Sequence, residues 1–107
     1  MQEQTNDMNF ADATYSNPDV HLSKPAMFKV VLVNDDYTPI EFVGEVLQNF
    51  FHKSQVEAQK ITQQINNEGL AICGFYTRDI AETKVGIVND CAAKSQHPLK
   101  CTFEEDM

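Results

Sequence analysis

The chain of 107 residues has few of the features that mark the commonest functional sites. Its four glycines form no phosphate-binding loop, and no stretch reaches the ~18 consecutive apolar residues that a transmembrane helix needs. The three cysteines, Cys73, Cys91 and Cys101, include no close pair, which argues against a disulfide framework and a CxxC zinc or redox site. The first residues lack the basic region and apolar run of a signal peptide. We therefore expect a cytoplasmic protein with buried, reduced thiols and no membrane partner.

Positive charge is also scarce. Eight lysine and arginine residues stand against 16 aspartate and glutamate residues, which gives a formal net charge of −8. Such a surface repels nucleic acid and anionic lipid, so neither is an expected partner, whereas a cationic ligand or protein patch would be attracted. The length fits one domain, and an apolar content of 42% supports one modest core.

The chain divides near residue 26 into two parts of different character. Residues 1–26 are acidic and show no clear period, so we interpret them as a flexible N-terminal extension ahead of a domain at 27–107. The domain opens on a β-branched run at 28–33 with apolar residues on both faces. This run predicts a strand that is covered on both sides, or nearly so.

Two capping patterns then predict two helices. In the first, Thr38 is the expected N-cap, with proline at the next position and Glu41 three residues after the cap, and an apolar stripe continues to about residue 52. In the second, Ser54 and Glu57 repeat the pattern, and Gly69 is the expected left-handed stop. The residues of this second helix that we expect to point inward are Val56, Ala58, Ile61 and Ile65.

A strand at 70–76, a helix that starts at Thr77 and a strand at 99–103 complete the predicted order β-α-α-β-α-β. The apolar residues of the last helix are Ile80, Ala81, Val85, Val88 and Ala92. Three strands are unstable unless helices cover a face, so we expect an α+β fold in which three helices pack with a small three-stranded antiparallel sheet.

The densest polar cluster is Asn34 to Thr38, where the first strand meets the first helix. These residue types are ordinary in turns and caps, which is one interpretation. Alternatively, the Asn34 carbonyl and the Asp35 carboxylate are an acceptor pair suited to an ammonium group. A Mg²⁺ site for phosphoryl transfer is a third hypothesis, but the second strand runs into Phe75-Tyr76-Thr77, the third into Thr102-Phe103, and the alternating βαβ order is missing.

The rest of the sequence gives little indication of a metal site or a catalytic nucleophile. His21, His52 and His97 form no i,i+4 pair, and Cys73 lies in an apolar strand without a base nearby in the sequence. We therefore expect no metal, no cofactor and no enzymatic activity.

The segment VLVNDDYTP at 31–39, followed by EFV at 41–43, resembles the ClpS adaptor family. The segments AICG at 71–74, AETKV at 81–85 and HPLKCT at 97–102 are also similar to that family, so the resemblance covers roughly residues 27–104. The combination is far more specific than any one of these motifs.

The resemblance implies a monomeric adaptor without a cofactor. It would bind substrates with a bulky hydrophobic N-terminal residue (Phe, Tyr, Trp or Leu), called N-degrons, and deliver them to the ClpA unfoldase of the ClpAP protease. The residues implied for the substrate's α-amino group are Asn34, Asp35 and Asn66. The residues implied for the side-chain pocket are Leu32, Thr38, Ile40, Val43, Thr62, Ile65 and Leu99. Docking on the N-terminal domain of ClpA is implied for Asp79 and Lys84, and entry into the unfoldase pore for the N-terminal extension.

The chain departs from the family pattern at several of these positions. Asn66 stands where the family usually has a histidine, Thr62 and Ile40 where members often carry methionine, and Asp79 where glutamate is more usual. Altered residues in the pocket leave an alternative open: a regulator that docks on the Clp unfoldase and inhibits or retargets it without selecting N-terminal residues.

Overall fold

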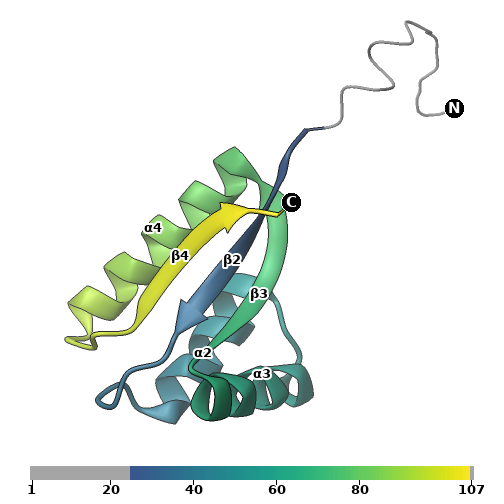
Figure 1. The fold of residues 1–107 in the computed structure, drawn as a ribbon. Coiled ribbons are helices and arrows are strands. Elements are labelled where there is room, and N and C mark those ends of the chain that lie inside the picture. Colours follow the sequence, from purple (N-terminus) through teal and green to yellow (C-terminus); the bar gives the residue numbers. More distant parts are fainter. Residues whose placement is uncertain (1–24, 107) are drawn as a thin grey trace, which may run out of the picture.

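The structure is a computed structural model and describes residues 25–106. The predicted extension therefore lies outside the described residues, except for its last two positions. The elements are β2 (Met27–Val33), α2 (Ile40–Phe51), α3 (Gln55–Glu68), β3 (Leu70–Thr77), α4 (Arg78–Lys94) and β4 (Lys100–Glu105) (Figure 1). The expected order β-α-α-β-α-β is confirmed.

The sheet has the strand order β3-β2-β4, and both neighbours run antiparallel to β2. The register of β2 against β3 shifts between Val30, which faces Gly74, and Val31, which faces Ile72. Cys73 is thus an extra residue on β3, the arrangement of a β-bulge, which bends and twists a strand locally. The predicted three-stranded antiparallel sheet of an α+β fold is confirmed.

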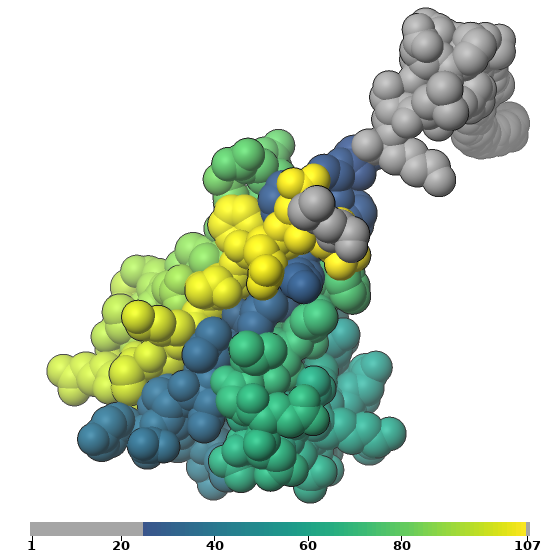
Figure 2. Space-filling view, in the orientation of Figure 1, coloured from purple at the N-terminus to yellow at the C-terminus, as the bar shows by residue number. Residues whose placement is uncertain are grey.

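The central strand is buried on both faces at its middle. Val30, Val31 and Leu32 are 0%, 5% and 0% exposed, and successive strand residues point to opposite faces. Val30 and Leu32 belong to the main core cluster with the helices, whereas Val31 does not. In Figure 2 the strands themselves form much of the face toward the viewer, and β3 leaves Leu70, Ile72 and Phe75 largely exposed.

The second capping pattern forms as expected. The Glu57 backbone N–H donates to Ser54 Oγ at 3.1 Å, and the Ser54 backbone N–H donates to Glu57 Oε1 at 3.1 Å. Gly69 ends α3 with φ of 91°, a left-handed conformation that glycine adopts without steric cost. Both ends of α3 are therefore fixed by local sequence.

The first capping pattern is wrong in detail. The N-cap of α2 is Pro39, which offers no side-chain hydrogen bond, and the helix begins at Ile40. The Thr38 hydroxyl donates instead to Asp35 Oδ2 at 2.6 Å. The turn at Asp35 competes for this hydroxyl, so the residue expected to start the helix belongs to the preceding loop.

One predicted inward position is also wrong, and one apolar residue of α4 is exposed. Val56 is 61% exposed and Ile80 is 49% exposed. Each lies in the first turn of its helix, and the nearby Ala58 and Ala81, at 2% and 0% exposure, occupy the buried face instead. A helical period identifies a stripe of apolar residues but does not show how far along the helix the stripe is covered.

Candidate functional site

The loop between β2 and α2 is organised around one carboxylate. Asp35 Oδ1 accepts the backbone N–H groups of Tyr37 and Thr38, each at 2.7 Å, and Oδ2 accepts the Thr38 hydroxyl. An ionised carboxylate offers about four lone-pair positions, so one position on Oδ2 remains for a further donor. The loop thus presents a carboxylate whose orientation is fixed by hydrogen bonds from other residues of the same loop.

The pKa of Asp35 reflects two opposed influences. Partial burial raises its pKa, but the hydrogen bonds from the Thr38 hydroxyl and the two backbone N–H groups, together with the charge of His97, bring the pKa below its ordinary value. Hydrogen bonds to the charged form of a carboxyl favour that form. Asp35 is therefore ionised at neutral pH and places a negative charge in the loop.

A backbone contact brings this loop against the end of α3. The Asn34 N–H donates to the Gly69 carbonyl oxygen at 2.8 Å, three residues beyond Asn66 in the chain. Both asparagine side chains are exposed, and an amide oxygen accepts hydrogen bonds. The loop residue Asn34 therefore meets the C-terminal end of α3, the end of the helix on which Asn66 lies.

The residues predicted for the side-chain pocket fall into two groups. The first group belongs to the main core cluster, and each member is at most 6% exposed: Leu32, Val43, Ile65 and Leu99. The second lies nearer the surface: Ile40 is 58% exposed, Thr38 is part-buried, and Thr62 is 7% exposed with its hydroxyl donating to the Ala58 carbonyl at 2.7 Å.

A groove of about 730 Å³ runs between α2 and α3 and includes part of this second group. Its lining from α2 is Ile40, Glu41, Gly44, Glu45 and Gln48, and its lining from α3 is Gln55, Ala58, Gln59, Thr62, Gln63 and Asn66. Three predicted site residues, Ile40, Thr62 and Asn66, thus meet in one groove. Most of the other lining residues were missed by the sequence analysis, although Gly44 inside the apolar stripe of the first helix was a usable signal.

The position of His97 also did not follow from the sequence. Its ring packs against the edge of Phe42 at a centroid distance of 4.6 Å, and its charge acts on Asp35. The connection between α4 and β4 that carries it is held by Asn89, which exchanges hydrogen bonds with the Cys101 backbone at 3.0 and 2.9 Å. No spacing in the sequence indicated that this histidine approaches the loop.

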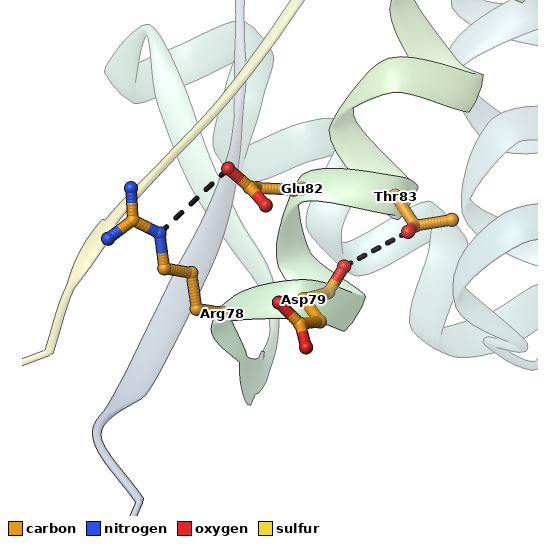
Figure 3. A network of polar contacts seen from close by, with 4 residues as sticks. All are labelled: Arg78, Asp79, Glu82 and Thr83. Carbon is orange, nitrogen blue, oxygen red and sulfur yellow. Dashed lines mark hydrogen bonds and ion pairs between the residues drawn. The ribbon is translucent and has the colours of Figure 1, made fainter.

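The two residues predicted for docking lie in different environments on α4. Asp79 is exposed in the first turn, beside the Arg78–Glu82 ion pair, and its carbonyl accepts the Thr83 hydroxyl at 3.0 Å (Figure 3). Lys84 is part-buried, and its Nζ donates to the Phe50 carbonyl oxygen at 2.6 Å, near the C-terminal end of α2. The Lys84 ammonium also lies 5.6 Å from the centroid of the Tyr76 ring.

Lys84 therefore stabilises the packing of α4 against α2. Replacing it with methionine removes a charge-assisted hydrogen bond at a helix C-terminus and should lower the free energy of unfolding by about 1–2 kcal/mol. Lys94→Met is the matched control: it removes an ion pair with Asp90 between largely exposed side chains and should cost less than about 0.5 kcal/mol. Urea denaturation of both variants makes the comparison, and equal losses would contradict the structural role of Lys84.

The described residues offer binding chemistry more readily than covalent chemistry. Burial raises the pKa of Cys73 and of Cys101 to about 12, so both thiols stay protonated at neutral pH. Between residues 25 and 106 no group of three or more His, Cys, Asp and Glu side chains could hold a metal ion. In the same range no helix is both long and apolar enough to cross a membrane. A fixed anion in the loop that precedes α2, and a groove with an apolar part that begins at the first residue of α2, suit a ligand that combines a cation with a hydrophobic group.

Comparison with known proteins gives a consistent result. The sequence model of the family described as "ATP-dependent Clp protease adaptor protein ClpS" matches residues 23–102. The ClpS adapter proteins of Phenylobacterium zucineum and Rhodospirillum centenum are 53% and 51% identical to the chain over 83 residues, which is 78% of this chain and 76% and 77% of theirs. Among solved structures, ClpS2 of Agrobacterium tumefaciens bound to L-phenylalaninamide is similar, with a TM-score of 0.75, 37% identity and coverage of 78% of this chain and all of that one.

Proposed function

Because the chain belongs to the ClpS family of Clp protease adaptor proteins, we propose that it binds substrates through a bulky hydrophobic N-terminal residue and delivers them to the ClpA unfoldase. In this role it acts as a monomer, without a cofactor, and catalyses no reaction. The substrate class comprises proteins that begin with Phe, Tyr, Trp or Leu. The unfoldase is contacted through its N-terminal domain.

The observation that carries this proposal is the Asp35 carboxylate, fixed by three hydrogen bonds and ionised, in a loop that leads into the first residue of the α2–α3 groove. A chain terminus carries an ammonium group directly beside its first side chain. L-Phenylalaninamide, the ligand of the Agrobacterium tumefaciens relative, combines the same two groups.

Asp35, Asn34 and Asn66 have distinct roles in this proposal. The remaining lone pair of Asp35 Oδ2 accepts one N–H of the ammonium group, and the charge makes this the strongest of the three hydrogen bonds. The side-chain carbonyls of Asn34 and Asn66 accept the others. An acetylated terminus offers one N–H and no charge, so it should not be held.

The substrate's first side chain packs against Ile40 and Thr62 at the end of the groove near Asn66. In this proposal the core residues Leu32, Val43, Ile65 and Leu99 and the part-buried Thr38 complete the pocket for that side chain. Burying an aromatic side chain here contributes about 1.5–3 kcal/mol.

Docking on the unfoldase uses the exposed face of α4 around Asp79. Lys84 belongs to the same helix, but its ammonium is bound to the Phe50 carbonyl, so that hydrogen bond must break before the ammonium contacts a partner. We therefore assign Asp79 the larger share of the docking energy.

An array of peptides that differ only in their first residue tests the proposal. We expect binding of peptides that begin with Phe, Tyr, Trp or Leu, and none of the same peptides after N-acetylation. Equal binding to all first residues, together with inhibition of ClpA, would instead favour a regulator that does not select N-terminal residues. The specific observation behind that alternative is the presence of Thr62 and Asn66 in the groove.

The affinity should depend little on pH between about 6 and 7, because the peptide's own α-amino group, with an ordinary pKa of about 7.7–8.0, begins to lose its charge above that range. Asp35 has a lowered pKa and is ionised across this range, and Asn66 does not titrate. Asn66→His should introduce a pH dependence, because a neutral imidazole accepts a hydrogen bond from the ammonium group and a protonated one repels it, so affinity falls toward pH 6. Calorimetric titration with a Phe-initiated peptide measures the wild type, Asn66→His and, because His97 acts on Asp35, His97→Gln. A histidine-like transition in the wild type that persists in His97→Gln would contradict the proposed role of Asn66.

A further inference from the structure

One face of the three-stranded sheet lies outside the main core cluster. Val30 and Leu32 of β2 belong to that cluster, and because strand residues alternate in direction, their neighbours point to the opposite face. The strand register places Val31 opposite Ile72 there. In Figure 1 α4 lies behind the strands, and in Figure 2 the strands form much of the surface on the near side. We define the open sheet face by its large apolar residues: Met27, Val31, Val33, Leu70, Ile72 and Phe75.

Much of the apolar surface of the open sheet face is accessible. Leu70, Ile72 and Phe75 on β3 are 50%, 40% and 50% exposed. Met27, at the start of β2, is 39% exposed on the same face. Single exposed apolar residues are common on proteins, but a cluster of several marks a surface for interaction. The open sheet face is therefore suited to a partner with apolar side chains.

The polar residues of the open sheet face add a positive charge. Lys29 lies opposite Phe75 on β3, and Lys100 lies opposite Val33. Glu104, opposite Lys29, is the only acidic residue that the three described strands place on this face. Two lysines against one glutamate are unusual in a chain with 16 acidic and eight basic residues. An acidic segment complements this charge, whereas the same face of a second copy does not.

The part of the sequence that precedes the described residues has the matching composition. Its acidic residues outnumber its one basic residue, and it carries several large apolar side chains. The charged residues are Glu3, Asp7, Asp12, Asp19 and Lys24. The apolar residues include Met8, Phe10, Tyr15, Val20 and Leu22. Residues 1–24 thus combine negative charge with apolar side chains, as the open sheet face requires.

The point of attachment allows this segment to reach the open sheet face. Residue 24 is joined to β2 through Pro25 and Ala26, and β2 begins at Met27, a member of that face. From Met27 to Val33 the face is about 20 Å long at about 3.3 Å per residue, whereas 24 extended residues span up to about 80 Å. A short tether gives an effective concentration in the millimolar range, so even a contact of millimolar affinity is occupied about half of the time.

We propose that residues 1–24 dock reversibly on the open sheet face of their own domain. Apolar side chains of the segment pack against Ile72 and Phe75, and its carboxylates lie near Lys29 and Lys100. The docking surface is on β2, β3 and β4, so the docking does not depend on what the α2–α3 groove binds. The open sheet face is covered while the segment is docked and exposed when the segment is drawn away.

Chymotrypsin cleavage after Phe10 and Tyr15 of the full chain, followed by mass spectrometry, tests the docking. A docked segment is cut only after it dissociates, so the cleavage rate reports the undocked fraction. We expect Ile72→Thr/Phe75→Thr to raise this rate by about 2- to 10-fold. Threonine retains a high strand propensity and both positions are exposed, so the urea midpoint should change little.

Val56→Thr/Ile80→Thr is the matched control for the sheet variant. It removes two apolar side chains of similar exposure, 61% and 49%, from α3 and α4 and should leave the cleavage rate unchanged. An unchanged rate in Ile72→Thr/Phe75→Thr, or an equal rise in both double variants, overturns the inference.

Changes in the segment itself leave every residue of the domain in place and provide the second arm. Replacing Phe10, Tyr15, Val20 and Leu22 together with serine removes apolar side chains proposed to dock. In the full chain this change should shift the backbone amide NMR signals of the open sheet face and leave those of α2 and α3 unmoved. If the signals of the open sheet face stay where they are in the wild type, the segment does not dock there.

Charge and protein concentration identify what covers the face. Lys29→Gln/Lys100→Gln should raise the cleavage rate by about 2- to 5-fold at low salt, and Lys60→Gln/Lys94→Gln, which changes exposed lysines of α3 and α4, should not. Because the docking is intramolecular, the rate should stay constant over an about 100-fold range of protein concentration. Protection that increases with concentration would assign the face to a second copy and contradict the proposal.

Discussion

Replacing Asp35 with alanine should weaken binding of a Phe-initiated peptide by about 10- to 100-fold, which corresponds to one lost charge-assisted hydrogen bond of about 1.5–3 kcal/mol. The variant also loses the acceptor that fixes the Tyr37 and Thr38 backbone N–H groups, so the loop relaxes. Asp35→Asn separates the two effects, because an amide oxygen still accepts hydrogen bonds from the loop but the charge is gone. We expect most of the loss to persist in Asp35→Asn.

Asp36→Ala is the matched control for Asp35. It removes an exposed carboxylate from the neighbouring position of the same loop and changes the net charge equally. Calorimetry with free and N-acetylated peptides completes the comparison. Wild-type affinity in Asp35→Asn, or equal losses in both alanine variants, would show that a specific carboxylate does not hold the ammonium group.

Removing residues 1–20 should abolish delivery and leave peptide binding intact. The proposed binding residues all lie at or beyond Leu32, so the truncated chain keeps the loop, the groove and the face around Asp79. The segment removed resembles the family's extension that enters the unfoldase pore. Degradation of a Phe-initiated fluorescent reporter by ClpAP should therefore fall to the level measured without adaptor.

Two controls decide the truncation experiment. Peptide affinity, measured by calorimetry, should agree with that of the full chain within about twofold, because no residue of the proposed site is removed. Replacement of residues 1–20 by a glycine-serine segment of equal length distinguishes a need for length from a need for sequence. A truncated protein that still accelerates degradation would contradict a role of the extension in delivery.

Much of the fold followed from short-range sequence patterns. The box of Ser54 and Glu57 and the left-handed Gly69 are local devices, and the structure contains both as expected. The Thr38 pattern used the same residue types and was wrong, since the Thr38 hydroxyl donates to Asp35 and does not accept a hydrogen bond from a helix N–H. Local sequence shows which hydrogen bonds are available but does not choose between competing partners of the same side chain.

The proposed binding site could be predicted from the sequence only in part. The acceptor residues of the loop were identifiable because they form the densest polar cluster of the chain and lie in a segment that resembles the ClpS family. The groove could not be identified from the sequence, since it exists only where α2 and α3 lie side by side, with Gly44 and Ala58 lining it from the two helices. The hydrogen bond of the Lys84 ammonium could not be predicted either, because its acceptor carbonyl lies 34 residues away in the chain.

By itself the sequence determined the element order, the cap and stop of α3, the acidic loop and the family, because each depends on neighbouring residues or on a string of identities. Only the tertiary structure decided which helix faces are covered, what Lys84 binds, that His97 approaches Asp35, and that two helices leave a groove between them. The physical reason is that burial and charge at these positions come from residues distant in the chain, which are brought together only when the helices pack on the sheet.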